Sequence, residues 1–157
     1  MFQIEHSFAL FVIIRFIRLM KKVLFICTHN SARSQIAEGL LRKVYGDRYE
    51  VYSAGTEPTS VNPNAIKVMA EIGIDISSHY SKSIDEFKGT QFDYVVTVCD
   101  NAKESCPYFP GGGTKLHQSF ADPSKFKGTD PEILAGFRQV RDEIKDWIEK
   151  SFNKRSV

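Results

Sequence analysis

The sequence contains few cysteines and carries little net charge, and each of these features argues against one class of protein. Three cysteines among 157 residues are an odd number, which does not suit the disulfide framework of a small secreted domain. We therefore expect a reactive thiol and a reducing compartment, namely the cytoplasm. The formal net charge of +2 produces no field strong enough to predict a nucleic-acid partner.

A long uninterrupted apolar run is also missing. Residues 8–20, FALFVIIRFIRLM, are interrupted by Arg15 and Arg18 and fall short of the ~20 apolar residues that a membrane-spanning helix needs. Two interpretations stay open. Residues 1–19 are an extension outside the fold that precedes a natural start at Met20, or they form an amphipathic helix on a membrane or a partner. We expect the first, without membrane contact.

The chain does contain an alternation of short apolar strands and helical patterns from Lys21 onward. Strand patterns occupy residues 23–26, 49–53, 92–98 and 115–117. Helical patterns occupy residues 35–45, 62–72, 83–87 and 130–148, with Val44 and Ile72 on buried faces and a loop at 111–113. Strands that are apolar on both faces are typical of parallel sheets covered by helices. We predict one α/β domain over residues 20–152, followed by a tail at 153–157.

Two cysteines stand at the ends of apolar strands. Cys27 follows the first strand pattern and Cys99 the third. In open parallel sheets the carboxyl ends of the strands lie at one edge, and ligands bind there. We therefore expect both thiols to point toward the same edge of the sheet.

The residues after Cys27 form the pattern C-x5-R-S, which ends with Arg33 and Ser34. A loop this short between a strand and a helix can turn its backbone N–H groups inward, which makes a nest for a tetrahedral oxyanion. Arg33 would close the ring with a bidentate guanidinium, and this positive environment is expected to lower the pKa of Cys27. Ser34 could donate to the thiolate or to the leaving group. The expected oxyanion-binding residues are Thr28, His29, Asn30, Ser31, Ala32, Arg33 and Ser34.

These residues carry a family resemblance. CTHNSARSQIAEG resembles the phosphate-binding loop of the low-molecular-weight tyrosine phosphatases and, more closely, that of the thioredoxin-coupled arsenate reductases that share their fold. The likeness continues through VYSAGTEP, VNPNAI, IDISSH, VVTVCDNAKESCPYFP, FADPSKF and VRDEIKDWIE, so it covers essentially residues 21–150. It implies a single-domain three-layer sandwich, in which helices cover both faces of a four-stranded parallel sheet.

Cys99 and Cys106 separate the two branches, because the phosphatases need no cysteine pair after the third strand. A straight helix would hold the two Cα atoms ~10 Å apart, beyond the ~7 Å within which a disulfide closes. The segment between them must therefore bend if they bond. The resemblance implies that Cys27 attacks arsenate held by Arg33 while Asp122 acts as general acid. Cys99 then attacks Cys27, Cys106 resolves that bond, and thioredoxin reduces the Cys99–Cys106 disulfide.

A potassium site of the relatives is altered in this chain. Asn30, Glu38 and Ser53 match three of its ligand positions, but Lys82 stands where potassium-binding relatives carry an acidic ligand. An ammonium group cannot coordinate a cation, and its own charge could occupy the site and pair with Glu38. We predict no bound metal and catalysis that does not depend on potassium. A rise in catalytic efficiency on adding potassium at fixed ionic strength, without a sodium effect, would contradict this.

The histidines give weaker signals. His29, inside the loop, could tune the Cys27 thiolate, but we expect a peripheral role because loop side chains usually point to solvent. His79 matches a position near the redox cysteines of the relatives and could donate to the Cys99 region, or it is a buried, hydrogen-bonded histidine. His117 shows no functional signal. Histidines and cysteines do not stand at short metal-ligand spacing, so a zinc site is not predicted.

Three functions are consistent with these residues. All three cysteines favour the reduction of arsenate to arsenite. For this function we expect a monomer that needs no cofactor and has thioredoxin as its partner. A tyrosine phosphatase needs only Cys27, Arg33 and Asp122, but Ser124 stands where an aromatic residue after Asp122-Pro123 would help to seat a phosphotyrosine ring. A non-catalytic arsenic or oxyanion sensor would use the thiols for binding alone.

Overall fold

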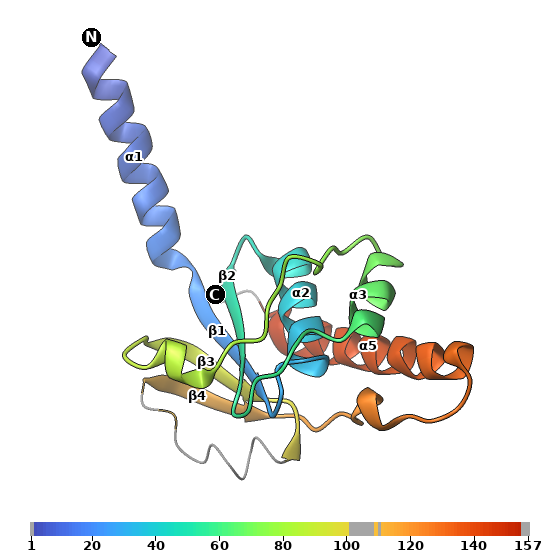
Figure 1. The fold of residues 1–157 in the computed structure, drawn as a ribbon. Coiled ribbons are helices and arrows are strands. Elements are labelled where there is room, and N and C mark those ends of the chain that lie inside the picture. The colour runs from blue at the N-terminus through green and yellow to red at the C-terminus, as the bar shows by residue number, and fades with distance from the viewer. Residues whose placement is uncertain (1, 101–108, 110, 155–157) are drawn as a thin grey trace.

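The domain is built on a sheet of four parallel strands in the order β2-β1-β3-β4. The computed structural model describes residues 2–100, 109 and 111–154. The strands are β1 (Lys21–Cys27), β2 (Tyr49–Gly55), β3 (Phe92–Thr97) and β4 (Gly112–His117) (Figure 1). Residues 23–27 of β1 are buried, as expected for a strand with a neighbour on each side and covered faces.

The register aligns the carboxyl ends of the inner strands. Cys27 of β1 pairs with Gly55 of β2, and Ile26 pairs with Thr97 of β3. Cys27 and Cys99 consequently lie at the same edge of the sheet, as the sequence predicted. The chain leaves this edge in the turns that carry the candidate site.

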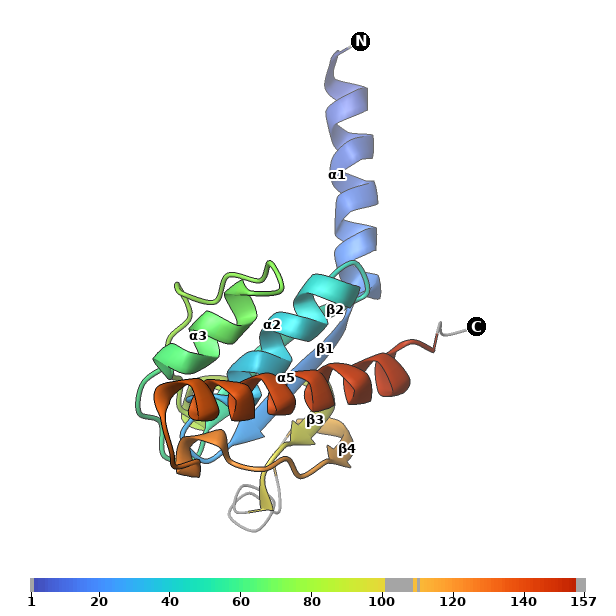
Figure 2. The same cartoon turned by 90° about the vertical axis from the view of Figure 1, so that its right-hand side faces the viewer.

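Three α-helices pack together over one face of the sheet: α2 (Arg33–Tyr45), α3 (Pro63–Ala70) and α5 (Asp130–Phe152) (Figure 2). Close packing joins α2 to α3, since a Cβ atom on Gly39 would lie 2.9 Å from the Met69 side chain. At the start of α5, Thr129 and Glu132 form a capping box, which satisfies backbone N–H groups at the helix N-terminus.

The opposite face carries the short helix η1 (Ile84–Phe87). Its Phe87 ring contacts Tyr52 and Phe92, and Phe92 also contacts Phe109. On the helical face, Phe152 of α5 lies against Phe25, Tyr49, Tyr94 and Trp147. Helical segments and aromatic side chains therefore cover both faces of the sheet, and the predicted four-stranded α/β fold is confirmed.

The structure corrects three local predictions. Gly112 and Gly113 were expected in a loop but belong to β4, where glycine allows close approach to Val95 and to the backbone of Asp93. The side chains of Val44 and Ile72 are each 38% exposed rather than buried. Helix α3 ends at Ala70, before Ile72, because the chain turns at Gly73 with φ +77°.

The N-terminal helix α1 (Phe2–Leu19) projects away from the sheet and its helices (Figure 1). The side chains of residues 7–15 are exposed along it. None of the helices in the described part of the chain is both long and apolar enough to cross a membrane. The division of the chain at residue 20 stays a prediction, as does the tail at 153–157.

Candidate functional site

The loop between β1 and α2 is held from outside by the backbone that follows β2. Residues 56–62 run beside it, and their N–H groups donate to carbonyl oxygens of the loop. The four bonds are Thr56 N to Cys27 O (3.2 Å), Glu57 N to Thr28 O (2.8 Å), Thr59 N to His29 O (3.1 Å) and Asn62 N to Ser31 O (2.9 Å). These four loop carbonyls therefore face residues 56–62, an arrangement in which the loop N–H groups can turn to the other side, as an anion-binding nest requires.

Gly55 allows this close approach. A Cβ atom at this position would lie 2.6 Å from Thr28 O and 2.9 Å from Asn30 N. Both contacts are shorter than a carbon atom tolerates, so a larger residue would push the loop out of place. Gly55 belongs to the motif VYSAGTEP, but no pattern in the sequence indicated its role.

Cys27 is buried at the start of the loop. Its sulfur lies 2.8 Å from Ser34 Oγ and accepts a hydrogen bond from Asn30 N at 3.1 Å. Burial raises the pKa of the Cys27 thiol, while the Ser34 hydrogen bonds and the charge of Arg33 act in the opposite direction. The prediction of a lowered pKa is therefore wrong for this structure, because removal of the sulfur from water outweighs the positive groups around it.

Asn30 is the centre of the hydrogen-bond network behind the loop. It is fully buried and has φ +48°, a left-handed conformation that asparagine tolerates better than most residues. Its Nδ2 donates to Ser34 Oγ (2.8 Å) and Ser53 Oγ (2.9 Å). Its Oδ1 accepts from Gln35 Nε2 (3.0 Å) and from Lys82 N (2.8 Å). The Asn30 side chain therefore serves the network behind the loop rather than facing an oxyanion.

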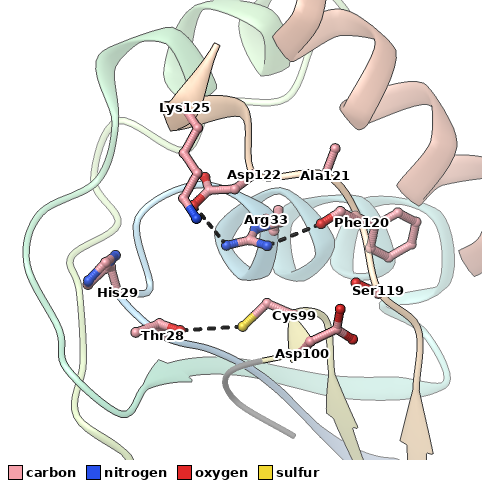
Figure 3. Close-up of a pocket in the computed structure, with 10 residues that line it drawn as sticks. All are labelled: Thr28, His29, Arg33, Cys99, Asp100, Ser119, Phe120, Ala121, Asp122 and Lys125. Atoms are coloured by element: carbon pink, nitrogen blue, oxygen red, sulfur yellow. Dashed lines mark hydrogen bonds and ion pairs between the residues drawn. The ribbon is translucent and has the colours of Figure 1, made fainter.

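Arg33, the first residue of α2, is held by the segment after β4. One guanidinium nitrogen donates to Phe120 O at 3.1 Å, and the other lies 3.3 Å from Asp122 Oδ2 (Figure 3). The structure thus brings together the predicted anion-binding arginine and the predicted general acid. In this arrangement the guanidinium charge is already compensated by a carboxylate.

Asp122 precedes η2 (Pro123–Lys125) and caps it. Burial alone would raise the pKa of Asp122, but hydrogen bonds from Ser124 and the charge of Arg33 together lower it below the ordinary value. Its Oδ1 accepts from Ser124 N (3.1 Å) and Ser124 Oγ (2.7 Å). In this state Asp122 is a carboxylate and a poor proton donor.

Two adjoining cavities meet at the Arg33–Asp122 pair. The smaller, about 200 Å³, is lined by Cys27 and the loop, and the larger, about 400 Å³, by Cys99. Arg33 and Asp122 line both. Cys99 Sγ lies 3.5 Å from Thr28 Oγ1 (Figure 3), and a charge on Cys99 raises the pKa of Cys27. The two sulfurs therefore line adjoining cavities that share Arg33 and Asp122, whereas Cys106 lies outside the described residues.

The remaining loop residues differ in exposure. His29 is exposed and lines both cavities, consistent with a peripheral role. Ser31 and Ala32 line the smaller cavity, and Ala32 is buried. Thr28, by contrast, lines only the cavity that contains Cys99.

The site that matches a potassium site does not fit a metal ion. Lys82 Nζ lies 3.8 Å from Glu38 Oε2 and donates to Tyr80 O at 3.0 Å, so an ammonium group stands against the ligand oxygens. Among the described residues no group of three or more His, Cys, Asp or Glu side chains is placed to hold a metal. The predicted pairing of Lys82 with Glu38 is confirmed by this contact.

His79 agrees with the second of its two interpretations, a hydrogen-bonded histidine, whereas the contacts of His117 were not expected. His79 contacts Gln35 Oε1 (2.9 Å) and an Arg42 nitrogen (3.3 Å), on the α2 side rather than beside Cys99. Burial lowers the pKa of His79, and the charge of Glu38 acts against this. His117 gave no functional signal, yet it bridges Thr97 Oγ1 (2.7 Å) and Asp100 Oδ1 (3.1 Å), next to Cys99. The strand register that joins His117 to Thr97 could not be read from the sequence.

The comparisons with known proteins agree with this geometry. Residues 22–155 match the low molecular weight phosphotyrosine protein phosphatase family. An arsenate reductase of Halalkalibacterium halodurans is 52% identical over 124 residues, which cover 79% of this chain and 89% of that protein. The arsenate reductase of Bacillus subtilis is 47% identical over 124 residues, which also cover 79% of this chain and 89% of that protein.

Solved structures show the same fold. An arsenate reductase in the phosphate-binding state has a TM-score of 0.71 and 34% identity, covering 87% of this chain and all of the other. A low molecular weight protein tyrosine phosphatase from T. tengcongensis has a TM-score of 0.71 and 28% identity, covering 86% of this chain and 99% of the other. The chain therefore belongs to the low molecular weight phosphotyrosine protein phosphatase family and, within it, to the arsenate reductases.

Proposed function

We propose that this protein reduces arsenate to arsenite through Cys27, Cys99 and Cys106, with thioredoxin or a similar dithiol protein as electron donor. The observation that carries the proposal is the meeting of Cys27 and Cys99 at adjoining cavities that share Arg33 and Asp122. A nucleophile, an anion-binding guanidinium, a carboxyl group and a second thiol are thus available to one bound oxyanion.

Arsenate binding would change the partners of Arg33. A tetrahedral dianion in the loop competes with Asp122 for the guanidinium, to which Asp122 is now bound at 3.3 Å. Once displaced, Asp122 loses a cation and faces an anion, and both changes raise its pKa. The same substrate thereby makes Asp122 a proton donor, which it is not in the unbound arrangement.

The chemistry then proceeds in two thiol steps. The Cys27 thiolate forms a bond to arsenic, and the departing hydroxide takes a proton from Asp122 and leaves as water. The Cys99 thiolate attacks Cys27 sulfur, so that an S–S bond forms, the S–As bond breaks and its electron pair stays on arsenic. Arsenic(V) becomes arsenic(III), and arsenite leaves.

Regeneration needs the third cysteine. The Cys106 thiolate attacks Cys99, which frees Cys27 and leaves a Cys99–Cys106 disulfide for an external dithiol to reduce. This route requires a reducing compartment, and we propose that the protein acts in the cytoplasm as a monomer. Residues 101–108, which include Cys106, lie outside the described part of the chain.

Phosphatase activity is a second candidate, because Cys27, Arg33 and Asp122 are the groups that phosphoryl transfer through a cysteine needs. Replacing Cys106 with serine (C106S) separates the two functions. Turnover of arsenate with thioredoxin should fall to background, because the Cys27–Cys99 bond is no longer resolved. Hydrolysis of p-nitrophenyl phosphate should continue at the wild-type rate.

The direct test is NADPH consumption with thioredoxin, thioredoxin reductase and arsenate, followed by mass mapping of disulfides after a single turnover. We expect steady consumption and a peptide pair that joins Cys99 to Cys106. Binding of arsenite without NADPH consumption would instead show an oxyanion sensor. Full arsenate turnover by C106S would contradict the relay.

A further inference from the structure

A continuous chain of polar contacts links the buried Lys82 ammonium to the sulfur of Cys27. Lys82 Nζ, with its side chain 11% exposed, lies 3.8 Å from Glu38 Oε2. Ser53 Oγ donates to the same Glu38 oxygen. The contacts then run through the Asn30 side-chain amide to Ser34 Oγ, which lies 2.8 Å from Cys27 Sγ.

The direction of each hydrogen bond in this chain follows from Glu38. Its carboxylate, paired with Lys82 and with Arg42, accepts hydrogen bonds and donates none. Ser53 donates its one hydroxyl hydrogen to Glu38, so Ser53 Oγ accepts the hydrogen bond from Asn30 Nδ2.

The second half of the chain is oriented in the same way. Lys82 N and Gln35 Nε2 both donate to Asn30 Oδ1, which fixes the amide with its two N–H bonds toward Ser53 and Ser34. Ser34 Oγ accepts one of them, so its own hydrogen is available to Cys27 Sγ. A serine that donates to sulfur favours the thiolate over the thiol.

We propose that Lys82 is a positioning residue for the reaction: its ammonium is a built-in cation that holds Glu38 as an acceptor and thereby keeps Ser34 donating to the Cys27 thiolate. The inference rests on the proposed role of Cys27 as nucleophile. Lys82 acts on this series of hydrogen bonds in two ways: its charge acts on Glu38, and its backbone N–H donates to Asn30. Only the charge depends on the side chain, so side-chain variants isolate it.

Arg42 does not provide the same function. It pairs with the other Glu38 oxygen, Oε1, at 2.6 Å, and its side chain is 48% exposed. The oxygen that receives Ser53 faces Lys82. Removal of the ammonium leaves this inner side of a buried carboxylate without its cation, which is costly where water cannot replace it.

The test compares K82M, which removes the charge, with K82D, which replaces the ammonium by a carboxylate. In K82D the new carboxylate would join Glu38 Oε2 and Tyr80 O, the two oxygens that Lys82 Nζ contacts, so that oxygen atoms, which a hard cation prefers, face the vacated position. K88M is the matched control, since Lys88 pairs with Asp85 at the surface with 74% of its side chain exposed. All are made in a C99S/C106S background, so that alkylation by iodoacetamide reports Cys27 alone.

Alkylation rates are measured against pH in choline chloride, then with potassium or sodium chloride at the same ionic strength. We expect K82M to react about tenfold more slowly near neutral pH, with its midpoint moved to higher pH, the size expected for the loss of one charge-assisted hydrogen bond to a thiolate. K82D should be slow in choline and recover in potassium but not in sodium. The parent and K88M should not respond to either cation.

With all cysteines intact, K82M and, in choline, K82D should lose kcat for arsenate and keep KM within about twofold, because the nucleophile and not the anion cradle is affected, whereas K88M should keep the parent's kcat. The proposal is overturned if K82M alkylates like K88M. It is also overturned if K82M fails to fold and potassium does not restore K82D, since Lys82 is then purely structural. Failure of arsenate turnover in the parent would reject the proposed function, while the alkylation result would still decide the role of Lys82.

Discussion

Replacing Cys27 with serine (C27S) should abolish both arsenate reduction and hydrolysis of p-nitrophenyl phosphate, each by about 10⁴-fold or more in kcat/KM. Both reactions begin with attack by this sulfur, and a hydroxyl group in the same buried position forms an anion far less readily. Serine is close in size to cysteine and can keep the contact with Ser34, so the melting temperature should change little.

The matched control is C99S. It removes a second buried sulfur at the same edge of the sheet, 3.5 Å from Thr28 Oγ1. It should stop arsenate reduction, because the S–As bond is no longer broken, and leave aryl phosphate hydrolysis near the wild-type rate. Arsenate reduction by C27S would show that the other two cysteines suffice and would reject the proposed order of thiols.

Replacing Gly55 with alanine (G55A) should lower kcat/KM for arsenate by about 10²-fold, the loss expected when a catalytic loop is displaced by about 1 Å. The new Cβ would lie 2.6 Å from Thr28 O and 2.9 Å from Asn30 N, so the loop must move. Phosphate affinity, measured by calorimetry, should fall in parallel, because the loop N–H groups no longer converge.

G113A controls for a general loss of stability. Its Cβ would lie 2.9 Å from Asp93 O, a comparable backbone contact, but on β4 at the far side of β3 from β1. It should lower the melting temperature while kcat/KM of the folded enzyme stays near wild type. Equal activity of G55A and G113A would show that the segment after β2 does not shape the loop.

The outline of the fold could be predicted because the two inner strands, β1 and β3, are short, apolar and bounded by turn residues. Residues 23–26 and 92–98 were expected as strands, and β1 and β3 occupy nearly the same positions. The glycines at 111–113 misled the prediction, since their flexibility suggests a loop. Gly112 and Gly113 instead use their missing side chains to pack against β3.

The candidate site, like the fold, could be predicted only in part from the sequence. The order C-x5-R-S identified the loop, and the strand ends at Cys27 and Cys99 indicated a common edge, because parallel strands align their carboxyl ends. The pairing of Arg33 with Asp122 was not expected, although both residues were. It depends on how the segment after β4 folds back over α2, which no local pattern reports.

The sequence by itself determined the chemistry available to this protein: a thiol at a strand end, an arginine that closes its loop, and a lysine where a cation ligand would stand. Tertiary structure alone decided the electrostatic state of these groups. Burial raises the pKa of Cys27, and Asp122 compensates the charge of Arg33. The physical reason is that a pKa and a hydrogen-bond direction depend on desolvation and on neighbours from distant segments, such as Gly55, Ser53 and Lys82, whereas residue types and spacing are local.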